Sequence, residues 1–341
     1  RRSVMGSLVA VGTHDVVWRY TRLRNRYRAA CSDSSVSECG GLAQAYTGAR
    51  RVILDHNSLS WNQDEAYGVW RGDPGPLREV TVSMSLVAEG LASHSTGLIV
   101  GGETSALSSK VTDIDAHHNL VMNNSHRNPL FKGRSGRVVN NLFYNQGSYI
   151  TQVGGGGSVD VVGNVFRKGP LTGGFHEIQA FRSRGADAYD GTPSLYVGGN
   201  VGWHQPDPMG EQWPMTRRVT GENGEETTTM PRGWRRPDPL PDPRHPIVAE
   251  PAATIAAEDG SIIPTVGASQ RLTCGGAWVA NRDSVDLRQL RQLRTGTGLT
   301  RLLRHQDEVG GLPKIARGRA CADADRDGMA DVWETDHGLS P

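Results

Sequence analysis

The 341-residue chain lacks an excess of charge of either sign, since 37 Lys and Arg face 36 Asp and Glu. This balance argues against a general nucleic-acid binder and against a polycationic protein of membrane surfaces. No run of apolar residues approaches the ~18 positions that a membrane-spanning helix needs. The sequence also lacks a P-loop and a dinucleotide-binding glycine motif, which argues against the corresponding nucleotide sites.

Glycine, in contrast, is abundant, with 43 residues in the chain, well above its usual share of ~7 %. Such a composition excludes a helical bundle and favours a fold rich in strands and turns. The length predicts roughly two domains, or one long domain with an appendage, and is sufficient to bury a core.

Cysteine is scarce, and its four positions allow three disulfide connectivities. We favour Cys31 with Cys39 and Cys274 with Cys321, the alternative being four unpaired buried thiols. Disulfides predict export, so we expect a secreted protein of bacterial type, in the extracellular space, the periplasm or at the cell surface. The sequence begins at Arg1 without Met or a signal-peptide pattern, and we therefore expect a mature or trimmed product.

Short β-rich runs recur along the first 200 residues, and each contains a polar residue at one equivalent position. These positions are Thr21, Asn57, Ser85, Asn119, Asn141, Asn164 and Asn200. Spacings with a floor near 22 residues are typical of stacked coils, so we predict an all-β fold, a right-handed parallel β-helix. Asn tolerates a left-handed corner and can hydrogen bond along the stack. The alternative, a β-sandwich, is disfavoured because two-residue Asn-Gly or Asp-Gly hairpin turns are missing.

The chain divides into four predicted segments. Residues 1–204 form the β-helix, and the Pro-rich residues 205–250 form a linker or extended arm. Residues 251–320 form a C-terminal extension with a short helix over 283–294, for which Asp283 or Ser284 is the cap and Gly296 the stop. Residues 321–341 form a tail.

The tail contains DADRDGMADVWE at 323–334, which has the spacing of an EF-hand-type calcium loop with Gly328 at its turn. The predicted ligands are Asp323, Asp325, Asp327, the carbonyl of Met329, Asp331 and Glu334. Five carboxylates in twelve residues suit Ca²⁺, a hard cation that prefers oxygen. The alternative is a solvated acidic tail.

A second cluster of candidate residues lies at 117–134 and is rich in imidazole and cationic groups. Its members are His117, His118, His126, Arg127, Lys132 and Arg134. Such groups suit an anionic ligand, and we expect a polyuronate, an acidic polysaccharide. Asp64, Glu65, Glu89 and His94 lie on preceding coils, on the order of 5–10 Å from Arg127 if the coils stack. We therefore expect a metal or carboxylate site there.

Several runs together resemble the pectate lyase superfamily of polysaccharide lyases. They are VILDHNSLSW (52–61), VTVSMSLVAEGL (80–91), HSTGLIVGG (94–102), HHNLVMNNSHRNPLF (117–131), RVVNNLFYN (137–145) and the stretches 276–298 and 323–341. The resemblance covers the chain from about residue 10 to the end and is weakest in 201–265. It implies calcium-assisted β-elimination of a uronic-acid polymer, in which cations neutralise the uronate carboxylate and a base removes the α-proton.

By this resemblance, Arg127 takes the position of the family's catalytic base and Lys132 that of the final arginine of its R.P..R motif, and we expect both to be catalytic. Because a guanidinium stays protonated in proteins, His117 and His94 remain alternative bases. We expect Arg134, His126 and Glu89 to bind substrate and Asp64 and Glu65 to bind metal.

The sequence also departs from the family pattern. Leu42 and Val69 stand where calcium-binding aspartates are expected, and Thr96 replaces a substrate-binding lysine. Three functions therefore stay open. The first is a lyase acting on a uronic-acid polysaccharide, the second a glycoside hydrolase that uses Asp55, Asp64, Glu65 and Glu89, and the third a non-catalytic carbohydrate-binding protein.

Overall fold

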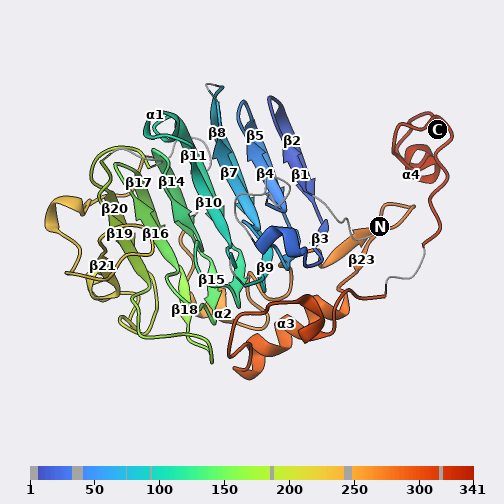
Figure 1. Cartoon of the computed structure of the whole chain (residues 1–341). Helices are drawn as coiled ribbons and strands as arrows, with labels where there is room; N and C mark the ends of the chain where they lie inside the picture. The colour runs from blue at the N-terminus through green and yellow to red at the C-terminus, as the bar shows by residue number, and fades with distance from the viewer. Residues whose placement is uncertain are drawn as a thin grey trace.

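A computed structural model describes residues 7–32, 41–73, 75–92, 94–184, 188–241, 248–314 and 318–341. It shows a right-handed parallel β-helix, as predicted, in which three sheets run along one stack of coils (Figure 1). Each coil passes from the eight-stranded sheet to the seven-stranded sheet and then to the six-stranded sheet. Strands far apart in sequence therefore become neighbours.

The strands of the three sheets alternate in chain order. The eight-stranded sheet holds β1 (Leu8–Ala10), β4 (Ala43–Tyr46), β7 (Tyr67–Arg71), β10 (Leu98–Gly102), β13 (Leu130–Phe131), β16 (Thr151–Gly154), β19 (Ile178–Phe181) and β21 (Thr216–Arg218). The seven-stranded sheet holds β2 (His14–Arg19), β5 (Arg50–Asp55), β8 (Leu77–Ser83), β11 (Val111–His117), β14 (Ser135–Val139), β17 (Ser158–Val162) and β20 (Ser194–Gly198). The six-stranded sheet holds β3 (Arg22–Arg24), β6 (Ser58–Ser60), β9 (Leu86–Ala88), β12 (Leu120–Met122), β15 (Leu142–Tyr144) and β18 (Val165–Arg167).

The core is built from aliphatic residues that repeat at the same position of each coil. Val52 pairs in register with Val80, and Val80 pairs with Ile114. All three are almost fully buried. Because alternate residues of a strand face opposite sides of the sheet, this register directs one apolar side chain per coil into the interior.

An asparagine ladder marks the corner between the seven-stranded and six-stranded sheets, as the recurring polar position predicted. The side-chain oxygens of Asn141, Asn164 and Asn200 accept hydrogen bonds from the backbone N–H of the ladder residue one coil earlier, at 2.9–3.0 Å. The left-handed residue of the corner is, however, the one before each ladder position, such as His118 (φ 54°). The ladder residue itself supplies the amide that pairs with its neighbours.

The C-terminal residues cover the outer face of the six-stranded sheet. Apolar side chains of α2 (Ala252–Ala256), of residues 262–266 and of α3 (Ser284–Thr295) pack on strands β9, β12, β15 and β18. The predicted helix is confirmed: Asp283 caps α3 and Gly296 ends it with φ 66°. The outward-facing apolar residues of this sheet are buried for that reason.

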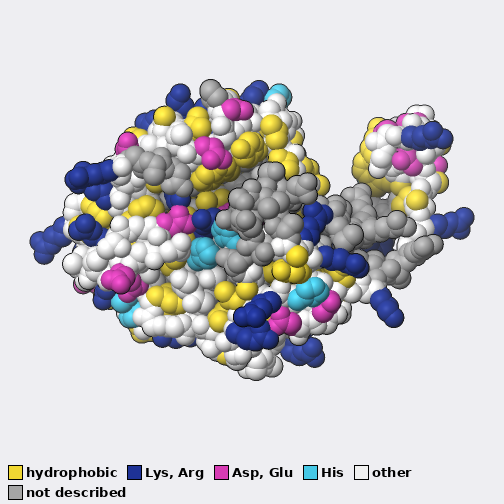
Figure 2. Space-filling model, viewed as in Figure 1, with side chains coloured by type: hydrophobic (Ala, Val, Ile, Leu, Met, Phe, Trp, Pro, Cys, Tyr) yellow, Lys and Arg dark blue, Asp and Glu magenta, His cyan; other side chains and the backbone are white. Residues whose placement is uncertain are grey.

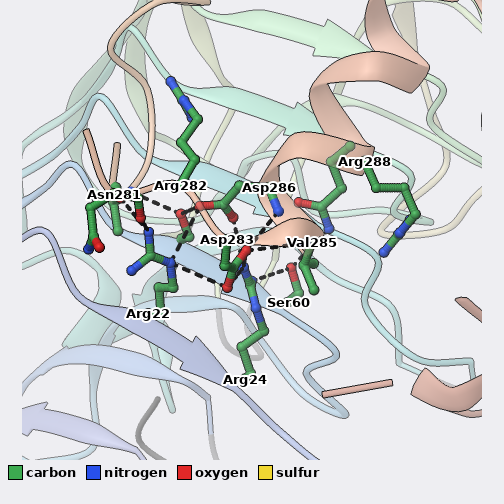
Figure 3. Close-up of polar contacts among 12 residues, drawn as sticks. Arg22, Arg24, Ser60, Asn281, Arg282, Asp283, Val285, Asp286 and Arg288 are labelled. Atoms are coloured by element: carbon green, nitrogen blue, oxygen red, sulfur yellow. Dashed lines mark hydrogen bonds and ion pairs between the residues drawn. The ribbon is translucent and has the colours of Figure 1, made fainter. Parts of the chain in front are cut away.

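Ion pairs fix α3 on the first coils (Figure 3). The fully buried Arg24 of β3 contacts Asp283 at 3.0 Å and Asp286 at 2.7 Å. Glu89, directly after β9, is also fully buried and accepts hydrogen bonds from Arg288 (2.8 Å) and from the indole of Trp61 (3.2 Å). Glu89 therefore belongs to the docking of α3.

Residues 205–250, expected to form a linker or arm, differ in the described part from that expectation. β21 pairs with β19, and Met230 and Trp234 lie in the core. The short 3-10 turns Trp213–Met215 and Arg232–Trp234 flank this part of the chain. β21 was not predicted because only three residues enter the sheet, within a segment whose prolines indicated a linker.

The tail contains α4 (Asp331–Asp336) and forms a separate lobe beside the β-helix (Figures 1 and 2). The predicted Cys274–Cys321 disulfide links it to the hairpin of β22 (Gln270–Leu272) and β23 (Trp278–Ala280). Of the other predicted bridge, Cys39 lies outside the described residues. Among the residues described, every helix is too short or too polar to span a bilayer.

Candidate active site

The candidate site lies at the corner through which successive coils enter the eight-stranded sheet. Asp64 and Glu65 belong to the connection between β6 and β7, His94 to that between β9 and β10, and Arg127 to that between β12 and β13. Because the coils stack in register, the guanidinium of Arg127 reaches the carboxylate of Glu65, 62 residues away in sequence. The structure thus brings together these four predicted site residues.

Arg127 and Lys132 share a second carboxylate, that of Glu222. Arg127 Nε and Nη2 lie 2.9 and 2.8 Å from Glu222 Oε1, and Lys132 Nζ lies 2.5 Å from Glu222 Oε2. Arg127 has a left-handed backbone (φ 56°), which costs energy in a non-glycine residue. Other non-glycine residues at the corners of the coils, such as His118, share this conformation.

These contacts keep Arg127 charged. Burial by itself lowers the pKa of Arg127, but the carboxylates of Glu65 and Glu222 outweigh burial and raise it. Burial likewise raises the pKa of Glu222, whereas Arg127 and Lys132 lower it, with a net decrease. In this arrangement the guanidinium of Arg127 is a cation in contact with two carboxylates.

Two histidines beside Arg127 are neutral at neutral pH. The rings of His94 and His126 are parallel, with centroids 5.7 Å apart. Burial is the main cause that lowers the pKa of His94. Burial, Arg127 and His94 together lower the pKa of His126 to about 4. A neutral imidazole is able to accept a proton, which the neighbouring guanidinium is not.

Asp64, Glu65 and His94 form a group that could hold a metal ion, since their ligating atoms lie within 4.8 Å of one another. His94 Nδ1 is 3.7 Å from Asp64 Oδ1, and His94 Nε2 is 3.9 Å from Glu65 Oε1. Burial and the adjacent Glu65 raise the pKa of Asp64. Burial opposes ionisation of Glu65, but Asp64 and Arg127 lower its pKa overall. The pair therefore holds one proton that a cation could replace.

The structure places three other predicted site residues away from this cluster. His117 ends β11 at the asparagine-ladder corner, with its Nδ1 2.9 Å from that of His118. Arg134 is exposed just before β14, at the opposite end of β13 from Arg127. Glu89, predicted to bind substrate, is instead buried against Arg288. In each case the strand carries the side chain to another corner or face of the coil.

The three substituted family positions have structural roles. Leu42 and Val69 lie in the core and are fully buried, so neither position points toward solvent. Thr96 is also buried, and its hydroxyl donates a 2.9 Å hydrogen bond to the backbone oxygen of Asp64. Thr96 thereby orients the connection that carries Asp64 and Glu65.

Sequence reasoning missed Glu222 and Tyr149. Tyr149, in the connection that leads to β16, packs edge-on against His126 with centroids 5.6 Å apart. Burial and Glu222 raise the pKa of its hydroxyl. Glu222 lies within the sequence GENG, whose glycines signal a tight turn but give no sign of its target.

The tail brings part of its predicted ligand set together. Asp323, Asp325 and Asp327 lie within 4.8 Å of one another, and Asp331 Oδ1 accepts a 2.8 Å hydrogen bond from Ala324 N. One carboxylate oxygen of Asp323 and one of Glu334 are buried without a hydrogen-bond partner. Burial and the four aspartates raise the pKa of Glu334. Met329, predicted to offer its carbonyl, is exposed and donates its N–H to Asp327.

Known proteins similar to the chain are pectate lyases by name. "Probable pectate lyase C" of Aspergillus fumigatus strain CBS 144.89 is 28 % identical over 334 residues, covering 96 % of this chain and 66 % of the relative. The protein of the same name from Aspergillus flavus is 27 % identical, covering 96 % and 67 %. No family model matches the chain. The chain thus spans about two thirds of the length of these fungal relatives.

Solved structures of pectate lyases are also similar. A pectate lyase of Bacillus sp. N165, in complex with trigalacturonate, has a TM-score of 0.46 and 15 % identity, over 74 % of this chain and 68 % of that one. Pectate lyase II of Xanthomonas campestris has a TM-score of 0.45 and 15 % identity, over 78 % and 80 %. The curated relatives thus support the resemblance of the chain to the pectate lyase superfamily along most of its length.

The raised pKa of Asp64 predicts a specific pH dependence of stability. Because the folded state holds this proton more tightly than the unfolded state, folding becomes less favourable as the pH rises from the ordinary Asp value of 3.8 through the raised pKa. Asp64→Asn removes this penalty. The free energy of unfolding of Asp64→Asn, minus that of the wild type, should increase over this range in urea titrations.

The same difference for exposed Asp259→Asn should stay flat. A flat difference for Asp64→Asn would show that Asp64 is already ionised.

Proposed function

We propose that the chain is a polysaccharide lyase that cleaves a pectate-like uronic-acid polymer by β-elimination. One observation carries the proposal: two cations, Arg127 and Lys132, converge on a single carboxylate beside the neutral imidazoles of His94 and His126. Elimination needs a cationic site for the uronate carboxylate and a neutral base near the α-carbon. The names of the curated relatives support the same reaction class.

In this proposal Arg127 and Lys132 bind the carboxylate of the sugar that loses its proton. Their positive charges stabilise the negative charge that develops on this carboxylate in the transition state. Arg127, the family's base position, remains protonated between its carboxylates. The base is then His94, which burial keeps neutral and which lies beside Asp64 and Glu65. The glycosidic oxygen leaves without consumption of water.

The resemblance to pectate lyases also implies a calcium ion, and the residues present fit one in part. Asp64 and Glu65 are two crowded carboxylates that retain one proton between them, and both are oxygen donors. They would hold Ca²⁺, which would supply further positive charge toward the uronate. His94, a nitrogen donor, suits calcium less well and stays available as the base.

A glycoside hydrolase on the same fold is less well supported. An acid–base pair must flank the scissile bond with both carboxyl groups available. Glu65 is instead paired with Arg127, Asp55 is held by Arg19 (2.7 Å) and Ser83 (2.8 Å), and Glu89 is buried under α3. A lyase needs no second free carboxylate.

We further propose that the protein is exported and that residues 323–334 bind a structural Ca²⁺. The Cys274–Cys321 disulfide supports an oxidising compartment. The buried, unpartnered oxygens of Asp323 and Glu334 support a cation in the tail, because such atoms are costly without one. The acidic polysaccharide is the proposed partner.

Activity assays should separate His94 from His117. His94→Gln and Arg127→Ala should each lower kcat/KM on polygalacturonate by about 100-fold or more, because one removes the base and the other a carboxylate-binding charge. His117→Gln, at the ladder corner, should stay within about twofold of the wild type. The readout is the ultraviolet absorbance of the 4,5-unsaturated product. Loss of activity in His117→Gln with retention in His94→Gln would reverse the assignment, and reducing ends without absorbance would indicate a hydrolase.

Removal of calcium should destabilise the tail. A chelator is expected to lower the melting temperature and to speed proteolysis near residues 323–334, because the uncompensated carboxylates repel one another. Asp325→Ala should show the same proteolysis with and without chelator. Equal sensitivity of the wild-type tail in calcium and in chelator would argue that these residues bind no metal.

A further inference from the structure

The carboxylate of Glu222 occupies the position in which a ligand carboxylate would meet Arg127 and Lys132. One of its oxygens faces the guanidinium and the other faces the ammonium group, at 2.5–2.9 Å. Lys132 is only 3 % exposed with Glu222 in place. An external carboxylate can therefore reach both cations only after Glu222 moves away.

A hairpin that begins with β21 presents Glu222 to the site. β21 continues into an antiparallel return, with Arg218 N bonded to Thr228 O and Val219 bridged to Glu226. At the tip, Gly224 N bonds to Gly221 O, and Asn223 has φ 56°. This turn aims Glu222 back over two strands of the eight-stranded sheet toward the end of β13.

The base of the hairpin is fixed independently of its tip. The carboxylate of Glu226 accepts hydrogen bonds from His176 N at 2.7 Å and from Gln179 Nε2 at 2.8 Å, and it contacts His176 Nδ1 at 2.7 Å. The contacts of Glu222, in contrast, are with the site itself. A movement of the tip would break the contacts of Glu222 and leave those of Glu226 intact.

We propose that Glu222 is an internal competitor for substrate carboxylates and thereby determines how strongly the Arg127–Lys132 subsite selects uronate over its neutral ester. This inference deepens the proposed function and rests on it for the choice of ligand. In the closed arrangement both cations are already neutralised, so a uronate must displace a carboxylate of equal charge. The apparent affinity for a uronate is therefore the intrinsic affinity multiplied by the fraction of molecules in which Glu222 has left the two cations. A neutral methyl ester gains nothing from displacing Glu222.

The test compares Glu222→Gln with Glu225→Gln, an exposed glutamate of the same hairpin. The probes are galacturonate, which has no glycosidic bond to cleave, and its neutral methyl ester, titrated by NMR or calorimetry. We expect Glu222→Gln to bind galacturonate about tenfold more tightly than the wild type. Binding of the ester should be unchanged, and Glu225→Gln should behave as the wild type. Melting curves verify that each variant is folded.

Unchanged or weaker binding of galacturonate by Glu222→Gln would overturn the inference, as would an equal gain for the acid and the ester, which would indicate a steric effect. The lyase assay is independent of these titrations. Tighter binding in Glu222→Gln without unsaturated product from the wild type would sink the proposed function and leave the role of Glu222 standing. Wild-type activity with unchanged Glu222→Gln affinity would do the reverse.

Discussion

The in-register stacking of parallel coils is the constraint on which the site depends. Each ladder amide holds the backbone of the neighbouring coil at a hydrogen-bond distance, so the corner positions cannot drift along the stack. The connections that enter the eight-stranded sheet inherit this register. Glu65, His94 and Arg127 meet for that reason, although none of them is a neighbour in sequence.

Opposite charges at this corner balance one another closely. Two cations face the carboxylates of Glu65 and Glu222, while Asp64 retains a proton. Such a cluster is costly to bury and stable only while every partner is present. A site of this kind responds to an added anion or cation by exchange of partners.

Much of this was readable from the sequence because it follows from periodicity. The asparagine positions identified the β-helix, and stacking predicted the approach of Glu65 and His94 to Arg127. The same reasoning grouped Glu89 and His117 with these residues, whereas the structure places both at other positions of the coil, because a shift of one residue at a corner turns a side chain to another face. Glu89 became part of the α3 interface, which depends on Arg288, 199 residues away.

Glu222 could not be predicted, because its approach to Arg127 depends on tertiary packing and not on a repeat. It lies 95 residues beyond Arg127 in a segment that the proline content marked as an arm. Only the pairing of β21 with β19 and the tight turn at Gly221 bring it back. A periodic sequence pattern does not predict where a non-repeating segment packs against the coils.

A double-mutant cycle between Glu65 and Arg127 tests the central claim most directly. Glu65→Gln, Arg127→Met and the double variant, compared in free energy of unfolding, should show a coupling of about 1 kcal/mol or more, because the two charges are in contact and largely buried. Additive effects of the two substitutions would mean that the coils do not bring these residues together, and the account of the site would be wrong.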